Sequence, residues 1–417
     1  DKNDIIAKNI FGKGVPDKVP TMADYLQEEG YQTVLLGKLH AEPSLADKSY
    51  GFRSCYEHWE DPKTENDRRS YYGFQYVKNV LGHGEAPVEY DHGHYGRWMH
   101  KQHPEIVEEV KKDRQSNARR PNMNIRMSKV PSELHNSTWL ANEACDYIEN
   151  HLDREKPLFM FIGFPDPHHD FVPPRDIAEN FMNIQVPEMA KLEKIQGEKT
   201  KGAMDMLRSN HASKKNIELA YKLTQASVSL IDRAVGKDKL KKENMYDDTI
   251  IIFTSDHGEM LGDYEALYKG DQPFYSLIHI PFIVKPAKGT DIPHKIEDPM
   301  SNADVLPTLF GMLGIEKPEN IQGVDIFKEG KGNMPMSTCY NLLGYNRNIS
   351  IYDEQYRYTY VTDTEEEELY NQKEDPKEYV NLAKKSEYRE ICDKMRERVL
   401  KKHLKCEIQI YGHYGTW

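Results

Sequence analysis

The sequence predicts an α/β fold, with a mostly parallel central sheet sandwiched by helices and a small C-terminal α+β subdomain that contains an antiparallel sheet. The first part rests on short apolar runs that alternate with segments of helical spacing. The second rests on alternating apolar and polar residues after about residue 347, which are typical of antiparallel strands. We therefore expect a main domain at residues 1–346 and a subdomain at residues 347–417. The apolar runs are at residues 33–36, 158–164, 249–254 and 281–284.

Helices are expected between these runs. The first covers residues 21–30, where Gly30 is a plausible C-cap. Residues 41–130 are polar and have no clear periodicity, which favours an insertion that shapes a pocket over a core element. The other helices are expected around residues 139–148, at 217–235, at 305–313 and, strongly charged, at about 387–403.

Composition limits the classes of partner. The 417 residues carry a formal net charge of -12, which argues against nucleic-acid binding because that needs clustered Lys and Arg. A local basic pocket for a small anion stays possible. No apolar run approaches the ~18 residues that cross a bilayer, so no membrane span is predicted. The five cysteines are widely spaced, which predicts reduced thiols, slightly favours a cytoplasmic location and disfavours a thiolate metal site.

A candidate metal site follows the apolar run at residues 249–254. The next residues include Asp256 and His257, followed by Gly258. Loops at the carboxyl ends of parallel strands build active sites, and this pair offers a carboxylate oxygen and an imidazole nitrogen to one metal ion. The alternative is that Asp256 caps the next helix and His257 is partly exposed.

Two lysines are candidates for holding an anion. Lys38 and His40 follow the run at residues 33–36, and alternate residues of an extended segment point the same way. Lys269 is followed by Gly270 and lies downstream of the Asp-His pair, where a lysine can lie against an oxyanion. The alternative for both lysines is an ordinary solvated loop residue.

Histidines supply the candidate for proton transfer. His168 and His169 lie in a proline-rich loop after residues 158–164, where a fixed histidine can protonate a leaving alkoxide. The alternative is that one of them packs against Phe171. His135 precedes a helix and is a weaker candidate for the pocket, with a capping or surface role as its alternative. His94 lies in an Asp-His-Gly-His cluster with metal-like spacing, and we favour a loop that shapes substrate access.

The order of these segments resembles the successive signatures of type I sulfatases of the alkaline phosphatase superfamily. The resemblance covers about residues 19–403, and collinear motifs in this number are very unlikely to match by chance. The matching segments are residues 30–40, 167–174, 247–263 and 269–281, together with residues 303–323 and 368–382.

The resemblance implies hydrolysis of a small-molecule or carbohydrate sulfate ester. Asp256 and His257 would then hold a divalent metal, with Ca²⁺ expected first. Mn²⁺ or Zn²⁺ is the alternative, because many calcium sulfatases have Asn where His257 stands. Lys38 and Lys269 would hold sulfate oxygens, His40 would support the hydroxyl of a formylglycine nucleophile, and His168 would be the leaving-group acid. These six side chains are expected around one cavity for a cation and an oxyanion.

The family's nucleophile motif, C/S-x-P/A-x-R, and its Asp-Asp pair precede Gly-Lys-x-His, and neither is found there in this chain. Residues 116–120 match the motif but lie in the insertion-like region, so we interpret the match as coincidence. The nucleophile segment is therefore expected to be missing, and truncation is favoured over a gene fragment or a non-catalytic descendant because the other site residues are intact. Phosphonate monoester or phosphodiester hydrolysis on the same scaffold is the alternative activity.

Overall fold

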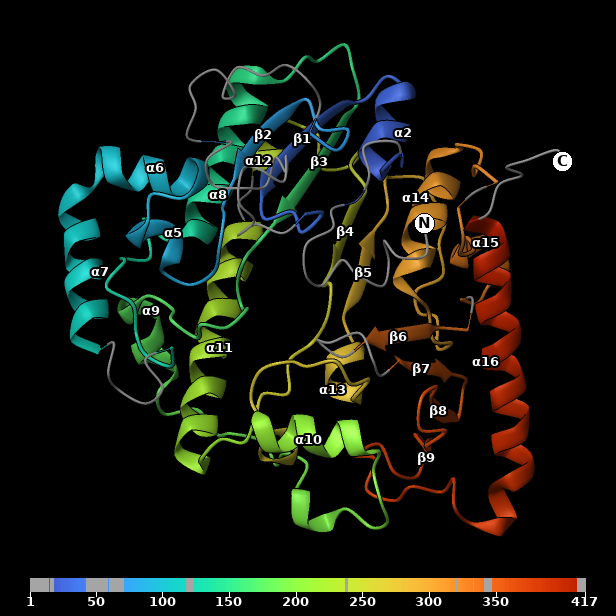
Figure 1. The fold of residues 1–417 in the computed structure, drawn as a ribbon. Coiled ribbons are helices and arrows are strands. Elements are labelled where there is room, and N and C mark those ends of the chain that lie inside the picture. The colour runs from blue at the N-terminus through green and yellow to red at the C-terminus, as the bar shows by residue number, and fades with distance from the viewer. Residues whose placement is uncertain are drawn as a thin grey trace, which may run out of the picture. The chain divides into compact units, whose positions relative to one another are not determined.

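The computed structural model describes residues 15, 19–42, 59, 71–117, 124–236, 239–319, 321–332, 334–340 and 347–410. These residues form two compact units. The N-terminal unit lies within residues 8–187 and 214–242, and the C-terminal unit within residues 188–213 and 243–417. The α-helices and β-strands of both units are labelled in Figure 1.

A three-stranded parallel sheet is the centre of the N-terminal unit. β1 (Gln32–Gly37) lies between β2 (Tyr76–Asn79) and β3 (Leu158–Gly163). Every residue of β1 is buried, as expected for a strand covered on both faces of a parallel sheet. The carboxyl ends of all three strands therefore lie at one edge of the sheet.

Helices cover both faces of this sheet. On one face, Val34 and Leu36 pack in a core with Trp139 and Leu140 of α8 (Asn136–Asp146). On the other, Leu35 packs in a core with Ala23 of α2 (Met22–Glu28). A capping box between Thr21 and Asp24 starts α2. The sequence-predicted helix at residues 21–30 is thus confirmed, and it ends before Gly30, whose φ is 86°.

The expectation of an irregular, non-core segment at residues 41–130 is corrected for residues 71–117. This stretch supplies β2 and the helices α5 (Ala86–Glu89), α6 (Gly93–Gln102) and α7 (Pro104–Asn117). Tyr95 and Met99 of α6 and Val107 and Val110 of α7 are buried in the core with β1. Each helix buries a narrow stripe of apolar residues and exposes many polar ones. The high average polarity of the segment therefore obscures the helical spacing of the few apolar residues.

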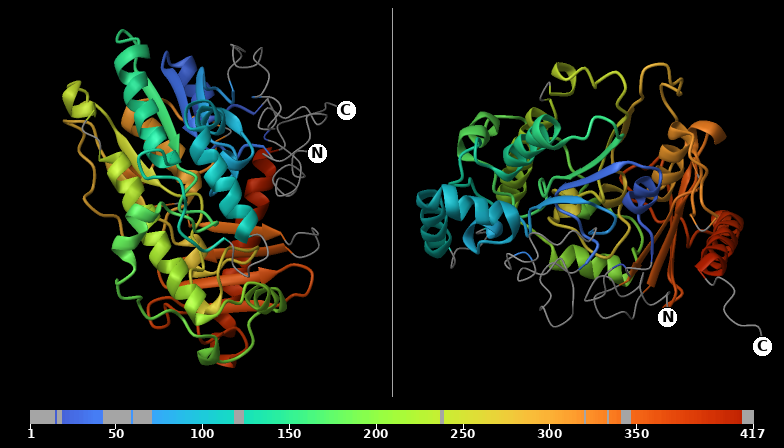
Figure 2. Two further views of the ribbon diagram at one scale, coloured as in Figure 1. Left: turned by 90° about the vertical axis from the view of Figure 1, so that its left-hand side faces the viewer. Right: turned by 90° about the horizontal axis from the view of Figure 1, so that it is seen from above.

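Two antiparallel sheets build the C-terminal unit. β4 (Ile251–Thr254) and β5 (Phe282–Lys285) form a pair, and β6 (Met336–Tyr340), β7 (Arg347–Tyr352), β8 (Tyr356–Val361) and β9 (Glu367–Asn371) form a sheet in that order. The long helix α16 (Arg389–Ile410) lies along this sheet (Figure 2). Its Met395 and Val399 pack with Ile351 and Tyr358. The predicted α/β fold with an antiparallel C-terminal sheet is confirmed, and the sheet includes one strand that precedes residue 347.

A buried ionic network ties β8 and β9 to the chain around residue 199. Arg357 Nε and Nη2 lie 2.5 and 2.6 Å from the two carboxylate oxygens of Glu378. Glu368 accepts a hydrogen bond from the Thr200 N–H at 2.7 Å. Lys199 Nζ donates to the Tyr370 hydroxyl at 3.0 Å. Pairing of this kind is what makes a charged group tolerable in a core.

The remaining elements complete the two units. No helix among the described residues is both long enough and apolar enough to cross a membrane. The N-terminal unit also has η2 (Tyr147–His151), α9 (Arg175–Ala178), η3 (Glu179–Phe181), α11 (Lys214–Val235) and α12 (Lys239–Lys242). The C-terminal unit also has η4 (Leu192–Lys194), α10 (Lys201–Ser209), η5 (Asp263–Glu265), α13 (Tyr275–Ile278), η6 (Asn302–Asp304), α14 (Val305–Leu313), α15 (Ile326–Glu329) and η7 (Ser386–Tyr388).

Candidate active site

Two glycines place Lys38 at the carboxyl edge of the parallel sheet. The Lys38 N–H donates to the Gly163 carbonyl at 2.7 Å, which continues the pairing of β1 and β3. A Cβ on Gly37 would lie 2.1 Å from the Gly163 carbonyl oxygen, and a Cβ on Gly163 would lie 2.0 Å from the Lys38 carbonyl oxygen. Only glycine fits at both positions, so the strand ends approach closely and bring Lys38 beside the loop that follows β3. His40, two residues further on, is exposed.

His83 connects Lys38 to His168. Its Nε2 lies 2.9 Å from Lys38 Nζ. Its ring stacks on the ring of His168, with centroids 3.8 Å apart and an interplanar angle of 13°. His83 was not predicted from the sequence. The available signal was a histidine between two glycines, Gly82 and Gly84, shortly after β2, a strand that was not predicted either.

The loop after β3 is held along its length. The Phe171 N–H donates to the Asn124 carbonyl at 2.8 Å, and the Arg126 N–H donates to the Phe171 carbonyl at 3.1 Å. Within the loop, His168 Nδ1 contacts the carbonyl oxygen of His169. The His169 ring lies 4.1 Å from the His168 ring and 6.5 Å from the ring of buried Phe171. The structure thus places both histidines at the sheet edge, with His168 in contact with the Lys38–His83 pair.

A buried polar network supports the two loops that carry His83 and His168. Glu85, which is 2% exposed, accepts hydrogen bonds from Ser128 Oγ at 2.5 Å and from the Lys129 N–H at 3.3 Å. It also pairs with Arg126. Arg114 Nη1 lies 3.9 Å from Asp170. Burial raises the pKa of Asp170, and the positive charge of Arg114 offsets part of that shift.

His135 lies behind the proline-rich loop as a helix cap. Its Nδ1 accepts a hydrogen bond from the Ser137 N–H at 3.3 Å, and its Nε2 lies 3.3 Å from Asp166 Oδ2. Both side chains are buried. Burial lowers the pKa of His135 and raises the pKa of Asp166. His135 therefore caps α8 and braces Asp166, two residues before His168.

His94 lies at the first turn of α6, where its side chain is partly buried. Its Nδ1 accepts a hydrogen bond from the Asn79 N–H at 3.1 Å. Burial, with the positive charges of Lys78 and Arg97, lowers the pKa of His94 to about 3. The ring is therefore neutral at physiological pH. Asn79 is the last residue of β2, so His94 fixes the strand that leads to His83.

The segment that matches the nucleophile motif begins in a helix. Ser116 is in the last turn of α7, where its exposed hydroxyl donates to the Asp113 carbonyl at 2.8 Å. Residues 118–120 of the match lie outside the described residues, as does Cys55.

The C-terminal unit carries a second group of charged and polar side chains at the end of β4. Asp256 Oδ1 accepts a hydrogen bond from the His257 N–H at 3.0 Å. His257 Nδ1 lies 2.7 Å from the Gly258 carbonyl, and its Nε2 lies 2.7 Å from Lys269 Nζ. A carbonyl only accepts, so Nδ1 carries the hydrogen and Nε2 presents a lone pair. Burial lowers the pKa of Lys269, and the negative charges of Asp256 and Glu259 offset part of that shift.

Gly258 is required by close packing against α13. A Cβ at this position would lie 2.0 Å from the Ser276 carbonyl oxygen. The Gly258 N–H donates to the Leu277 carbonyl at 2.7 Å. The glycine of the Asp-His-Gly sequence therefore lets the loop lie flat on the helix and fixes the direction of His257.

A strained loop carries Lys269. Four of its non-glycine residues have positive φ: 43° at Leu261, 54° at Tyr264, 62° at Glu265 and 67° at Tyr268. Such backbone persists only where the surroundings fix it. Here the Met260 N–H donates to the Tyr268 carbonyl at 3.1 Å, and the Asn210 side-chain amide donates to the Lys269 carbonyl at 3.0 Å.

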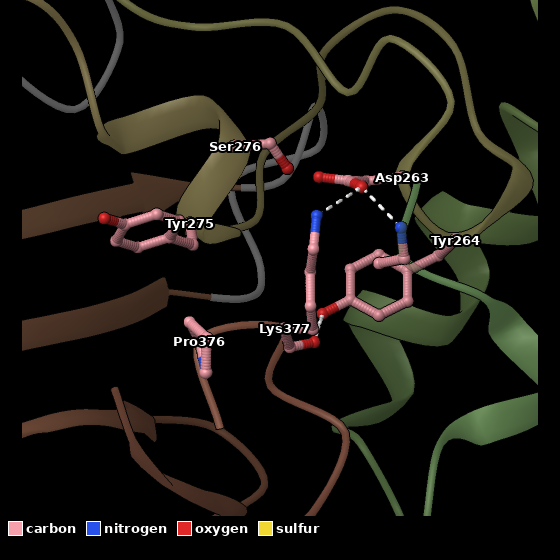
Figure 3. Close-up of a pocket in the computed structure, with 7 residues that line it drawn as sticks. Asp263, Tyr264, Tyr275, Ser276, Pro376 and Lys377 are labelled. Carbon is pink, nitrogen blue, oxygen red and sulfur yellow. Dashed lines mark hydrogen bonds and ion pairs between the residues drawn. The ribbon is translucent and has the colours of Figure 1, made fainter. Parts of the chain in front are cut away.

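A small pocket of about 140 Å³ in the C-terminal unit is a different feature. Its charged groups are paired with each other or with backbone, because Asp263 Oδ1 accepts a hydrogen bond from the Ala190 N–H at 2.7 Å and lies 3.5 Å from Lys377 Nζ (Figure 3). None of the sequence-predicted site residues lines it. It is lined by Ala190, Asp263, Tyr264, Tyr275, Ser276, Pro376 and Lys377.

Asp256 and His257 suit a divalent cation as two donors of a larger set. The Asp256 side chain is 65% exposed, and Oδ2 lies 3.6 Å from His257 Nε2. The hydrogen bond from Nδ1 to Gly258 leaves Nε2 as the ligating atom, which is the arrangement that second-shell contacts produce in metal sites. Among the residues that the structure describes, no cluster of three or more His, Cys, Asp or Glu side chains is placed to hold a metal. Further donors are therefore needed to complete a site.

Two family models match the chain. The model "Sulfatase" matches residues 3–315. The model "N-sulphoglucosamine sulphohydrolase, C-terminal" matches residues 274–405.

Individual proteins are similar over most of the chain. An arylsulfatase of Clostridium perfringens is 24% identical over 398 residues, which are 91% of this chain and 77% of the relative. A structure solved with its substrate D-glucosamine-2-N,6-O-disulfate has a TM-score of 0.67 at 17% identity and covers 96% of this chain and 85% of its own. A phosphonate monoester hydrolase from Silicibacter pomeroyi has a TM-score of 0.65 at 16% identity, covering 94% and 81%. Because the Sulfatase model matches well over half of the 417 residues, this chain belongs to the sulfatase family, whose members are hydrolases that act on sulfate esters.

Proposed function

We propose that the protein hydrolyses a sulfate monoester of a small molecule or carbohydrate to the alcohol and sulfate. Family membership supports the reaction class. The observation that carries the proposal is the pair of lysine–histidine contacts, Lys38 with His83 and Lys269 with His257. In each contact a lysine ammonium lies beside an imidazole, a group that can transfer a proton or bind a metal. In this proposal both lysine–histidine pairs serve the same reaction.

Lys38 and Lys269 hold sulfate oxygens in this proposal. An ammonium group has three donors and no acceptor, so it is suited to an oxyanion whose negative charge grows in the transition state. Both lysines are partly buried, and both are oriented by an imidazole nitrogen. Preorganised donors of this kind cost little reorganisation at the moment of reaction.

His168 is the proposed acid that protonates the leaving alcohol. Its Nδ1 faces a carbonyl oxygen, which only accepts, so Nδ1 carries a hydrogen and Nε2 is the atom that exchanges the second proton. The stacking of His168 on His83 supports His168 over His169 for this role, because His83 also contacts the sulfate-binding Lys38.

Asp256 and His257 would hold a divalent metal, which would supply positive charge beside the nucleophile and the sulfate oxygens. Ca²⁺ is the first candidate. The imidazole ligand also suits Mn²⁺ or Zn²⁺. His40 is proposed to support the nucleophile, and its exposed position agrees with a partner outside its own loop.

The proposed nucleophile is a formylglycine supplied by a segment outside residues 1–417. The one motif match within the chain, at residues 116–120, begins in the last turn of α7, where the Ser116 hydroxyl bonds to its own helix. Reading the complete coding sequence tests this point. An in-frame C/S-x-P/A-x-R ahead of the Gly-Lys-x-His segment is expected, and its absence would favour a non-catalytic sulfatase-like protein.

The activity test uses protein expressed from the complete coding sequence together with a formylglycine-generating enzyme. We expect hydrolysis of 4-nitrophenyl sulfate that falls about 10²–10³-fold in Lys38→Ala and in Lys269→Ala, the size seen when one oxyanion donor is removed. Lys288→Ala is the matched control, because this lysine is 78% exposed and pairs with surface Asp247. No turnover by protein whose formylglycine is verified by mass spectrometry would reject the proposal.

Phosphonate monoester hydrolysis is the second candidate. It is supported by the phosphonate monoester hydrolase from Silicibacter pomeroyi, whose structure is similar over 94% of this chain, and by the imidazole in the proposed metal pair. A direct comparison of sulfate and phosphonate esters separates the two candidates.

A further inference from the structure

His83 occupies the space between two groups of the proposed reaction. Its Nε2 lies 2.9 Å from Lys38 Nζ, and its ring lies flat against His168 at 3.8 Å. The three residues come from three different segments, which follow β1, β2 and β3 respectively. The parallel pairing of these strands brings their ends together, so the contact is set by the sheet rather than by a chance surface approach.

The protonation of this group follows from its partners. The Lys38 ammonium only donates, so His83 Nε2 accepts, and a neutral His83 carries its hydrogen on Nδ1. Protonation of Nε2 would oppose the Lys38 charge. His83 therefore accepts a hydrogen bond from Lys38 and presents the face of its ring to His168. Different substitutions of His83 can remove these two properties separately.

The backbone that carries His83 is fixed on both sides. Gly82 and Gly84 have φ values of 95° and 55°, so the turn adopts a shape that other residues disfavour. Glu85 then holds the turn through Ser128 and Arg126, as described above. A side chain on so constrained a turn loses little entropy when it holds its partners.

We propose that His83 is a positioning residue for sulfate-ester hydrolysis, which fixes the Lys38 ammonium through Nε2 and the plane of His168 through ring stacking. It thereby couples the cation that holds sulfate to the acid that protonates the leaving group. This inference rests on the proposed function. The inference adds His83 to the proposed function as a residue that contacts both Lys38 and His168 but neither holds sulfate nor protonates the leaving group.

Two substitutions separate the two contacts. His83→Gln keeps an acceptor near the position of Nε2 but removes the ring, and His83→Phe keeps the ring but removes the acceptor. We expect His83→Phe to weaken binding of inorganic sulfate about tenfold in calorimetric titration and to raise KM for 4-nitrophenyl sulfate by a similar factor. We expect His83→Gln to keep sulfate affinity within about twofold and to lower kcat about tenfold, because the acid loses its orientation. His294→Gln, at an exposed histidine, is the control.

A spectroscopic measurement tests the contact without reference to activity. Long-range ¹H–¹⁵N spectra of the imidazole nitrogens should report His83 as the Nδ1–H tautomer near neutral pH, and the Nε2–H tautomer would overturn the inference. Equal effects of His83→Gln and His83→Phe on sulfate affinity and kcat, or no effect of either, would overturn it as well. If the unsubstituted protein neither binds sulfate nor turns over the ester, the proposed function fails instead, and the tautomer still decides the contact.

Discussion

Lys269 Nζ lies 2.7 Å from His257 Nε2. The Nε2 lone pair therefore accepts from the Lys269 ammonium, and a metal ion bound by His257 would need the same lone pair. The hydrogen on Nδ1 is committed to the Gly258 carbonyl at 2.7 Å, which leaves His257 no second free lone pair. Lysine and metal therefore compete for the same nitrogen unless the ammonium turns toward a bound anion.

Removing the lysine should consequently strengthen metal binding while it slows hydrolysis of the sulfate ester. We expect Lys269→Met to tighten Mn²⁺ binding about tenfold in calorimetric titration, because a positive charge next to a ligand atom is removed. Lys288→Met, at an exposed lysine, should leave the affinity unchanged. Weaker Mn²⁺ binding by Lys269→Met would show that the lysine supports the metal site instead.

Stability should fall in mild acid because of His94. Burial and the charges of Lys78 and Arg97 lower its pKa to about 3 from its ordinary value of about 6.5. Between these values the unfolded chain binds the proton more tightly, so the free energy of unfolding falls as the pH drops below about 6.5. At pH 5.5 this group alone should cost about 1.4 kcal/mol relative to pH 7.5.

Urea denaturation at pH 7.5 and pH 5.5 measures this contribution. His94→Asn, which keeps a polar group near Nδ1, should lose about that much of the pH dependence. His294→Asn, at an exposed histidine, should keep it. The same pH dependence in His94→Asn and in the unsubstituted protein would show that His94 is not the titrating group.

Alanine at Gly163 should be far more damaging than alanine at Gly30. A Cβ on Gly30 meets nothing within 4 Å, so its cost is the positive φ of 86°, about 1–2 kcal/mol. A Cβ on Gly163 would lie 2.0 Å from the Lys38 carbonyl oxygen, so the backbone must move. We expect Gly163→Ala to lower the thermal midpoint more than Gly30→Ala and also to weaken sulfate binding. Equal midpoints for the two variants would contradict the close approach of the strand ends.

The buried Arg357–Glu378 pair should be essential to the C-terminal unit. Both side chains are 1% exposed, and removing the Glu378 charge leaves buried Arg357 with the more distant Glu368 carboxylate at 3.4 Å. Glu378→Gln should therefore cost about 3–5 kcal/mol of unfolding free energy in urea denaturation. Glu374→Gln, at an exposed glutamate of the same loop, is the control and should change stability by less than about 0.5 kcal/mol. A loss in Glu378→Gln no larger than in the control would contradict the importance of the pair.

Elements whose pattern depends on neighbouring residues could be predicted from the sequence. The apolar run that became β1, the helical spacing of α2 with Gly30 after it, and the alternation in β7 and β8 each depend on residues near one another, so period and capping rules predicted them. β2 and α6 were missed because Tyr76, Tyr95 and Met99 are separated by polar residues, and only packing against β1 reveals them as core.

The same distinction applies to the candidate site. Lys38 and the Asp256–His257 pair were found because each follows an apolar strand directly, and Lys269 because Gly270 follows it. His83 was not found, since its partners Lys38 and His168 are 45 and 85 residues away and only the parallel pairing of β1, β2 and β3 brings them together. The structure places Lys38 with His168 through His83, and Asp256 with His257 and Lys269, whereas His94 and His135 have structural contacts within the N-terminal unit.

The reaction itself is tested most directly by the ratio of kcat/KM for 4-nitrophenyl sulfate to kcat/KM for phenyl 4-nitrophenylphosphonate, measured on protein with verified formylglycine. Sulfate-ester hydrolysis with Lys38 and Lys269 on the sulfate oxygens predicts a ratio well above one that falls in Lys38→Ala and Lys269→Ala. A ratio well below one would contradict it and assign the site to phosphonate esters.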